Sequence, residues 1–139
     1  YRGIKLIKDP FDYLLYQMII NEVKPDLIIE IGTNHGASAL YMADMLDLLG
    51  NGMIHTMDIM EYPMDPLIIN NPRIKRFLGG YQNYDINLTK NFNTILIIDE
   101  VQNMVSEDGT FYKTLFDILK TADPSLKLIL LFKFSLHIT

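Results

Sequence analysis

An acidic residue followed by a glycine loop is the first pattern in this chain that could do chemistry. Glu30 stands two residues before Gly32, and Gly36 follows four residues later. Gly32 permits a tight turn, and Gly36 lets the next helix begin close to a ligand. Amides at a helix start suit an anionic carboxylate or phosphate, whereas Glu30 would repel a pyrophosphate and attract an ammonium. Because Asn34 also breaks the dinucleotide pattern G-x-G-x-x-G, the loop favours a nucleotide that carries an amino acid.

Asp58 comes about 20 residues after this loop, at the end of a segment, 53–58, with the character of a strand. An acid in that position, at the tip of the second strand of a nucleotide-binding unit, commonly accepts hydrogen bonds from ribose hydroxyls. Two alternatives remain open. Asp58 could merely begin a turn, as aspartate often does, and the glycines could serve only the geometry of a strand, turn and helix.

Helical patterns surround these residues. Asp9-Pro10 predicts a helix start, with aspartate as the N-cap and proline in the first turn, and Lys24-Pro25 predicts its end. We expect one apolar stripe of this helix to face a sheet, namely Phe11, Leu14, Leu15, Met18 and Ile19. Further helices are predicted over 37–49 and over about 108–120, the latter capped by Ser106 or Asp108.

Strand patterns alternate with the helices. The predicted strands are 27–31, 53–58, 73–78, 94–99 and 126–134. Segment 60–72 holds three of the six prolines and is expected to be a long loop with a short helical turn. The alternation predicts an α/β fold, in which a doubly wound, Rossmann-like and mostly parallel sheet has the order 3-2-1-4-5 in a single domain, 1–139. Ligands bind at the carboxyl ends of the strands in such sheets, where the glycine loop and Asp58 fall.

The composition excludes several classes of protein. A formal net charge of -5 gives no basic footprint for nucleic acid, and no segment has the roughly 20 apolar residues of a membrane helix. There is no cysteine for a disulfide or a thiolate metal site. His35, His55 and His137 are too scattered to suggest a metal cluster. We therefore expect a cytoplasmic protein with neither a nucleic-acid nor a membrane partner.

The segments 13–16, 24–32, 36–40, 43–44 and 49–50 resemble the cephalosporin hydroxylase and rhamnosyl O-methyltransferase family. The resemblance covers about residues 9 to 105. It implies a class I methyltransferase fold, here lacking the C-terminal strand pair, that binds S-adenosylmethionine and in several members magnesium. It places the methionine portion against Glu30, Gly32 and Gly36, the ribose against Asp58, and the adenine near Gly80-Tyr81-Gln82. The complete implied cofactor set is Glu30, Gly32, Thr33, Asn34, Gly36, Ser38, Asp58 and Tyr81.

The resemblance also implies a catalytic position at Asp99, with Asp99 and Glu100 as ligands of Mg²⁺. Adjacent carboxylates suit this hard cation, which would lower the pKa of a substrate hydroxyl and aim it at the methyl carbon. The family usually shows Asp-x-x-His here, whereas this chain has Gln102. The alternative is that Asp99 and Glu100 are solvated acids of a loop and bind no metal.

We therefore expect O-methylation of a small molecule or sugar by S-adenosylmethionine. One alternative is a non-catalytic nucleotide-binding or assembly module derived from a methyltransferase. A nicotinamide-dependent oxidoreductase is the other, and Glu30 and Asn34 argue against it. The strand 126–134 would leave an apolar edge through which two copies of the chain could pair.

Overall fold

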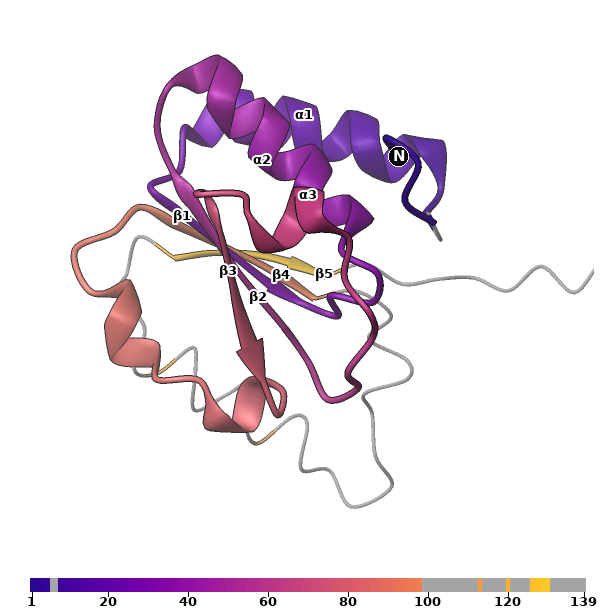
Figure 1. Cartoon of the computed structure of the whole chain (residues 1–139). Coiled ribbons are helices and arrows are strands. Elements are labelled where there is room, and N and C mark those ends of the chain that lie inside the picture. The colour runs from indigo at the N-terminus through magenta and orange to yellow at the C-terminus, as the bar shows by residue number, and fades with distance from the viewer. Residues whose placement is uncertain (6–7, 99–112, 114–119, 121–125, 131–139) are drawn as a thin grey trace, which may run out of the picture.

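In the part of the chain that the structure describes, the sheet has five strands, all of them parallel. The computed structural model describes residues 1–5, 8–98, 113, 120 and 126–130 (Figure 1). Its strands are β1 (Leu27–Ile31), β2 (Met53–Asp58), β3 (Ile74–Leu78), β4 (Thr94–Ile98) and β5 (Lys127–Leu130). They are ordered β3-β2-β1-β4-β5. Both the predicted fold class and the predicted strand order are confirmed.

Helices cover one face of this sheet. Figure 1 shows α1 (Pro10–Val23), α2 (Ala37–Leu49) and α3 (Pro66–Ile69) on the same side, with the short turns η1 (Tyr81–Asn83) and η2 (Ile86–Thr89) on the other. The boundaries of α2 agree with the prediction, and α3 is the short helical turn expected within 60–72. The predicted helix over 108–120 lies outside the described residues apart from Lys113 and Lys120, as does 131–134 of the last predicted strand.

The core has two layers because successive residues of a strand point to opposite faces of the sheet. Ile28, Ile54 and Ile95 pack against α1 and α2, whereas Ile29 and Met57 pack on the opposite face. All five residues of β1 are buried, as are those of β4. Continuous burial is typical of parallel strands covered on both faces, and it gives the site at their carboxyl ends a rigid base.

The prediction for the buried face of α1 was wrong for Phe11, Leu14, Leu15 and Met18, whereas Ile19 is half-buried and packs against the core. Phe11 and Met18 are 78% and 60% exposed, and Leu14 is 54% exposed. The helix instead buries Tyr16 and Ile20. Its orientation follows from ring contacts, since the Tyr13 ring lies edge-on to those of Tyr16 and Tyr41, with centroids 6.1 and 4.5 Å away.

No helix in the part of the chain that the structure describes is both long and apolar enough to cross a membrane. α1 and α2 have 14 and 13 residues, respectively, whereas a membrane span needs about 20. This agrees with the absence of a long apolar run in the sequence.

Candidate functional site

The glycine loop joins β1 to α2 at the carboxyl edge of the sheet, as predicted. Three of its residues have positive φ: Gly32 at 107°, Asn34 at 48° and Gly36 at 82°. Side chains disfavour this region, so two of the three positions are glycines and the third is asparagine, which tolerates it better than most residues. The sequence thus determines a compact loop that turns the backbone sharply from the strand into the helix.

The loop is fastened to the end of β2. The amides of Gly32 and Thr33 both donate to the Met57 carbonyl, at 2.8 and 3.2 Å. The Asn34 amide donates to the Asp58 carboxylate at 2.8 Å. Three consecutive amides are therefore held by the neighbouring strand, which fixes the loop relative to the tip of β2.

The last two loop amides are satisfied within the loop itself. The His35 amide donates to the Asn34 side-chain oxygen at 2.8 Å, and the Gly36 amide donates to the Thr33 carbonyl at 2.8 Å. The loop amides are therefore not the donors available to an anion. In the first turn of α2, by contrast, the N-cap, Gly36, makes no side-chain capping hydrogen bond.

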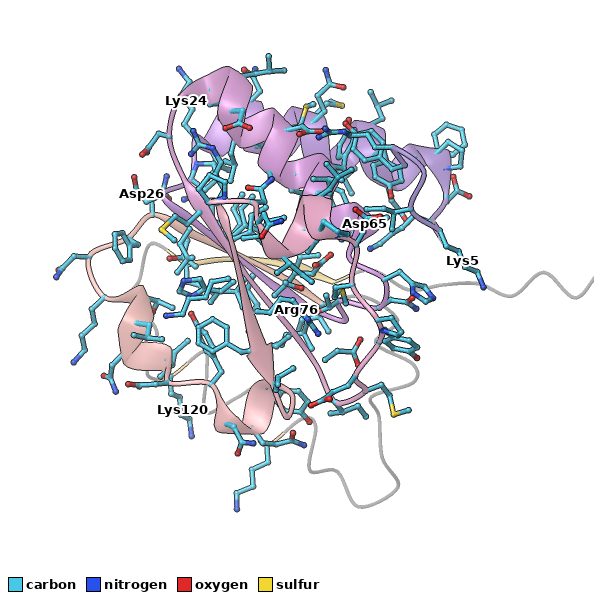
Figure 2. The ribbon with its side chains drawn as sticks, viewed as in Figure 1. Lys5, Lys24, Asp26, Asp65, Arg76 and Lys120 are labelled. Carbon is cyan, nitrogen blue, oxygen red and sulfur yellow. The ribbon has the colours of Figure 1, made fainter. Side chains whose placement is uncertain are left out.

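Gly36 has a second structural reason to be glycine. A Cβ there would lie 2.4 Å from Cδ1 of Ile68 and 3.3 Å from the sulfur of Met64. Ile68 belongs to α3, whose N-cap Asp65, labelled in Figure 2, accepts from the Leu67 amide at 2.9 Å. Where the sequence suggested room for a ligand, the structure has a side chain of α3. The helix start and α3 are thereby locked together.

Asp58 lies at the tip of β2 and contacts the loops on both sides. One carboxylate oxygen accepts from the Asn34 amide, and the other accepts from the Met60 amide at 3.0 Å. Its carbonyl accepts from the Gly80 amide, after β3, at 3.1 Å. Each carboxylate oxygen still has a lone pair for a further donor, and the side chain is only half-buried.

Glu30 lies beneath the loop rather than on its surface. It is fully buried, and its two oxygens accept from the hydroxyls of Ser38, on α2, and Thr56, on β2, the latter at 2.7 Å. The Thr33 and Thr56 hydroxyl oxygens are 2.6 Å apart. Three of the predicted cofactor residues, Glu30, Thr33 and Ser38, thus form one buried network. Sequence reasoning missed its fourth member, Thr56.

Tyr81 begins η1 directly after β3 and lines an apolar recess on the opposite face of the sheet, with Ile31 and Met57 among its neighbours. Nearby, the Tyr84 hydroxyl lies 2.7 Å from Nδ1 of His55. Burial, and next the charge of Lys75, lowers the pKa of His55 to about 4. Burial, and next the charge of Asp85, raises the pKa of Tyr84. Both rings are thus neutral at physiological pH and have a structural role in the core.

The segment after β2 returns beside the glycine loop. The rings of His35 and Tyr62 are 5.0 Å apart, centroid to centroid, and inclined at 55°. Tyr62 was not predicted to belong to the site, because its position in a proline-rich loop gives no signal of which loop it will contact. The contact brings the segment after β2 against the glycine loop.

The predicted catalytic and metal-binding residues, Asp99 and Glu100, lie outside the described residues. Within the described ranges, no group of three or more histidine or acidic side chains could hold a metal ion. The described residues do bring together the α2 amino terminus, the glycine loop and Asp58.

A family model described as Rhamnosyl O-methyltransferase/CmcI matches residues 1–109. The chain belongs to this family. The resemblance noted in the sequence is thereby confirmed over most of the chain.

Curated relatives match a shorter segment. The rhamnosyl O-methyltransferase of Mycobacterium tuberculosis is 35% identical over 75 residues, which are 53% of this chain and 31% of that protein. A putative ATP-dependent RNA helicase, R563, of Acanthamoeba polyphaga mimivirus is 41% identical over 56 residues, which are 40% of this chain and 9% of that protein. The match therefore spans less than a third of either relative.

Solved structures show the same fold. A CmcI structure with SAH has a TM-score of 0.63 and 19% identity, and the match covers 94% of this chain and 64% of that one. A CmcI structure with Mg-SAM has the same TM-score at 18% identity, with coverage of 94% and 55%. An SAH-bound methyltransferase of Podospora anserina has a TM-score of 0.61 at 20% identity, with coverage of 89% and 53%. This family member therefore has the class I methyltransferase fold.

Proposed function

We propose that this chain is the cofactor-binding core of an S-adenosylmethionine-dependent methyltransferase that methylates an oxygen of a small molecule or sugar. The observation that carries the proposal is the arrangement at the carboxyl edge, where the glycine loop, the α2 amino terminus and Asp58 lie together. Membership of a methyltransferase family supports it.

The described residues fit this cofactor. The first-turn amides of α2 begin at a glycine N-cap, so no side chain competes with the methionine carboxylate for them. The carboxylate of Asp58 keeps one lone pair on each oxygen for the ribose hydroxyls. Gly32 and Asn34 shape the loop between these two points, and Tyr81 marks the side of the sheet edge on which the adenine would lie.

Glu30 acts from behind the loop in this proposal. Its oxygens accept from Ser38 and Thr56, and the residue is fully buried. A direct contact with the cofactor ammonium would need these hydrogen bonds to rearrange. We therefore assign Glu30, Thr33 and Ser38 the role of holding the loop. The ammonium group of the cofactor would be stabilised by the electrostatic field of the buried Glu30 carboxylate and by groups on the loop surface.

The bound cofactor would supply an electrophilic methyl group on a sulfonium. The protein's share of the reaction is to bring an acceptor oxygen in line with that methyl, to exclude water and to remove the acceptor proton. We assign the proton removal to Asp99, with Glu100 beside it as a second ligand if Mg²⁺ is held there. A CmcI structure of the same fold was solved with Mg-SAM, which makes Mg²⁺ a reasonable metal to test.

A second function has one observation in its favour. A segment of the chain matches a putative RNA helicase as well as methyltransferases. The matched segment can therefore occur in proteins of different activity. A non-catalytic module that binds the cofactor or a nucleotide would fit that finding. It predicts saturable cofactor binding without transfer of the methyl group to any acceptor.

Isothermal titration of the purified chain with S-adenosylmethionine, and separately with NAD, tests the proposal. Saturable binding of S-adenosylmethionine alone is expected. An absence of binding by a chain with a cooperative unfolding transition would refute the methyltransferase proposal. Methyl transfer from labelled cofactor to a panel of phenols, sugars and hydroxylated small molecules would then separate the enzyme from the module.

Two further expectations belong to the same proposal. We infer a cytoplasmic protein, consistent with the absence of a membrane-spanning helix in the described part of the chain. We also infer pairing of two copies through β5, which is the edge strand of the sheet among the described residues, since an edge strand exposes backbone donors and acceptors. Light scattering of the purified chain measures the second directly.

A further inference from the structure

Two polar residues on neighbouring strands lie side by side directly behind the glycine loop. Glu30 on β1 and Thr56 on β2 are register partners in the parallel ladder. Both are fully buried, on the face that α2 covers. The preceding positions on this face of the two strands, Ile28 and Ile54, are apolar and belong to the core. The pair is therefore a polar interruption of the core, located where the core meets the loop.

The hydrogen bonds of this pair run in one direction. Thr56 donates its single hydroxyl proton to Oε2 of Glu30. Its oxygen can then only accept, so the 2.6 Å contact with the Thr33 hydroxyl requires Thr33 to donate. The chain of donors thus leads from Thr33 in the loop, through Thr56, to the carboxylate. Ser38 donates to the other oxygen of Glu30 from α2.

The network connects the loop to two separate elements. Thr33 lies between two left-handed residues, Gly32 and Asn34, and its side chain is 3% exposed. Without the Thr56 hydroxyl, the buried Thr33 hydroxyl would lose its acceptor and Oε2 of Glu30 would lose a donor in the core. A buried polar group left unsatisfied costs free energy, so the loop conformation and the network stabilise each other.

We propose that Thr56 is a positioning residue for the cofactor loop. It does not contact the cofactor in this proposal; it holds Thr33, and through Thr33 the left-handed backbone of the loop, in the shape that accepts the cofactor. The part that concerns affinity rests on the function proposed above. The part that concerns the shape of the loop does not, and it can be tested without any cofactor.

Three variants and one control separate this role from a general effect on the core. Thr56→Val is nearly isosteric and removes both hydrogen bonds, whereas Thr56→Ser keeps the hydroxyl. Thr33→Val cuts only the link to the loop and leaves Glu30 paired with Thr56. The control is Thr94→Val: Thr94 is also a buried threonine, on β4, and donates to the Phe92 carbonyl at 3.1 Å, at the opposite end of the strands.

Hydrogen–deuterium exchange of the cofactor-free chain is the first measurement. The peptide containing residues 32–36 should exchange roughly tenfold faster in Thr56→Val and in Thr33→Val, the factor expected from the loss of one hydrogen bond. Thr56→Ser should restore near-native exchange, and Thr94→Val should leave this peptide unchanged. Equal exchange in Thr56→Val and Thr94→Val would overturn the proposal. Should Thr56→Val fail to fold, Thr33→Val decides the same point.

Titration with S-adenosylmethionine is the second measurement. Affinity should fall roughly tenfold in Thr56→Val and Thr33→Val and return in Thr56→Ser, with no change in Thr94→Val. Faster exchange with unchanged affinity would overturn the positioning role while leaving the proposed function intact. If the wild-type chain fails to bind, the proposed function fails, and the exchange experiment still decides whether Thr56 holds the loop.

Discussion

The carboxylate of Asp58 accepts a hydrogen bond from the backbone amide of Asn34 at 2.8 Å. Asn34 has a φ of 48°, a left-handed conformation that costs a residue with a side chain about 1 kcal/mol or more. A hydrogen bond from an amide to a carboxylate offsets a cost of this size. The residue assigned to the ribose therefore also stabilises the loop assigned to the methionine, and the two halves of the site depend on one side chain.

Replacing Asp58 by alanine should weaken binding of S-adenosylmethionine by about 10- to 100-fold. The variant removes the proposed ribose acceptor and the partner of the Asn34 amide, each a hydrogen bond to a charged group. Calorimetric titration measures the effect. Asp9→Ala is the matched control, because its carboxylate also accepts from a backbone amide, that of Phe11, but at the start of α1. It should cost about 1 kcal/mol of stability with unchanged affinity; an equal loss of affinity in both variants would contradict the assignment.

Gly36→Ala should destabilise the fold more than Gly50→Ala. Both glycines have similar left-handed φ values, 82° and 77°, so both variants carry a backbone strain of about 1–2 kcal/mol. A Cβ at Gly50 meets nothing within 4 Å, whereas one at Gly36 meets Ile68 at 2.4 Å. Urea unfolding compares the two. Adding Ile68→Val, which deletes Cδ1, should recover part of the unfolding free energy that Gly36→Ala loses. If the free-energy losses of the two substitutions simply add in the double variant, the contact is unimportant.

Stability should fall as the pH is lowered through the window between about 6.5 and 4. The pKa of His55 is 6.5 in the reference state and about 4 in the fold, so over this window the unfolded chain binds a proton that the folded chain excludes. Unfolding is then favoured by acid, and the contribution of neutral His55 is fully present only above the window. Urea midpoints of the wild type and His55→Gln across this range test it, and the variant should have the shallower profile. Parallel profiles would contradict the prediction.

Asp99→Asn should abolish binding of Mg²⁺ while leaving the affinity for S-adenosylmethionine within about twofold. The reason is that a carboxylate is a much better ligand for this cation than a neutral amide, whereas the proposed cofactor contacts come from the glycine loop and Asp58. Titration of Mg²⁺ into the chain saturated with cofactor measures it. Asp85→Asn, at the exposed N-cap of η2, is the control. Unaltered Mg²⁺ binding in Asp99→Asn would place the metal, if any, elsewhere.

Most of the fold could be predicted from local patterns. The Pro10–Val23 helix has a clear N-cap in Asp9, the Ala37–Leu49 helix ends at Gly50, and the buried strands are short, mostly apolar runs between turns. The rotation of α1 could not be predicted, because the helix carries two apolar stripes. One contains Phe11 and Met18, and the other contains Tyr16 and Ile20. Which one is buried depends on the ring of Tyr41, which the helix meets on α2, and periodicity contains no information on that contact.

The site was predictable in outline but not in its interior. Spacing alone placed the glycine loop and Asp58 at the same sheet edge. The partnership of Glu30 with Thr56 depends on the register of β1 against β2, which no local pattern gives. The burial of Gly36 under Ile68 depends likewise on where a short helix in a proline-rich segment comes to rest.

The central strand has a consequence for how the chain must be made. β1 pairs with β2 on one side and with β4 on the other, Leu27 lying opposite both Met53 and Thr94. During synthesis, β1 emerges long before β4 does, so one edge of this buried and mostly apolar strand stays unpaired until β4 is made. Parallel pairings distant in sequence form slowly and expose the chain to aggregation. We expect expression at low temperature, or with chaperones, to raise the yield of this protein. Fragments of the chain that end before Ile98 should be insoluble when expressed.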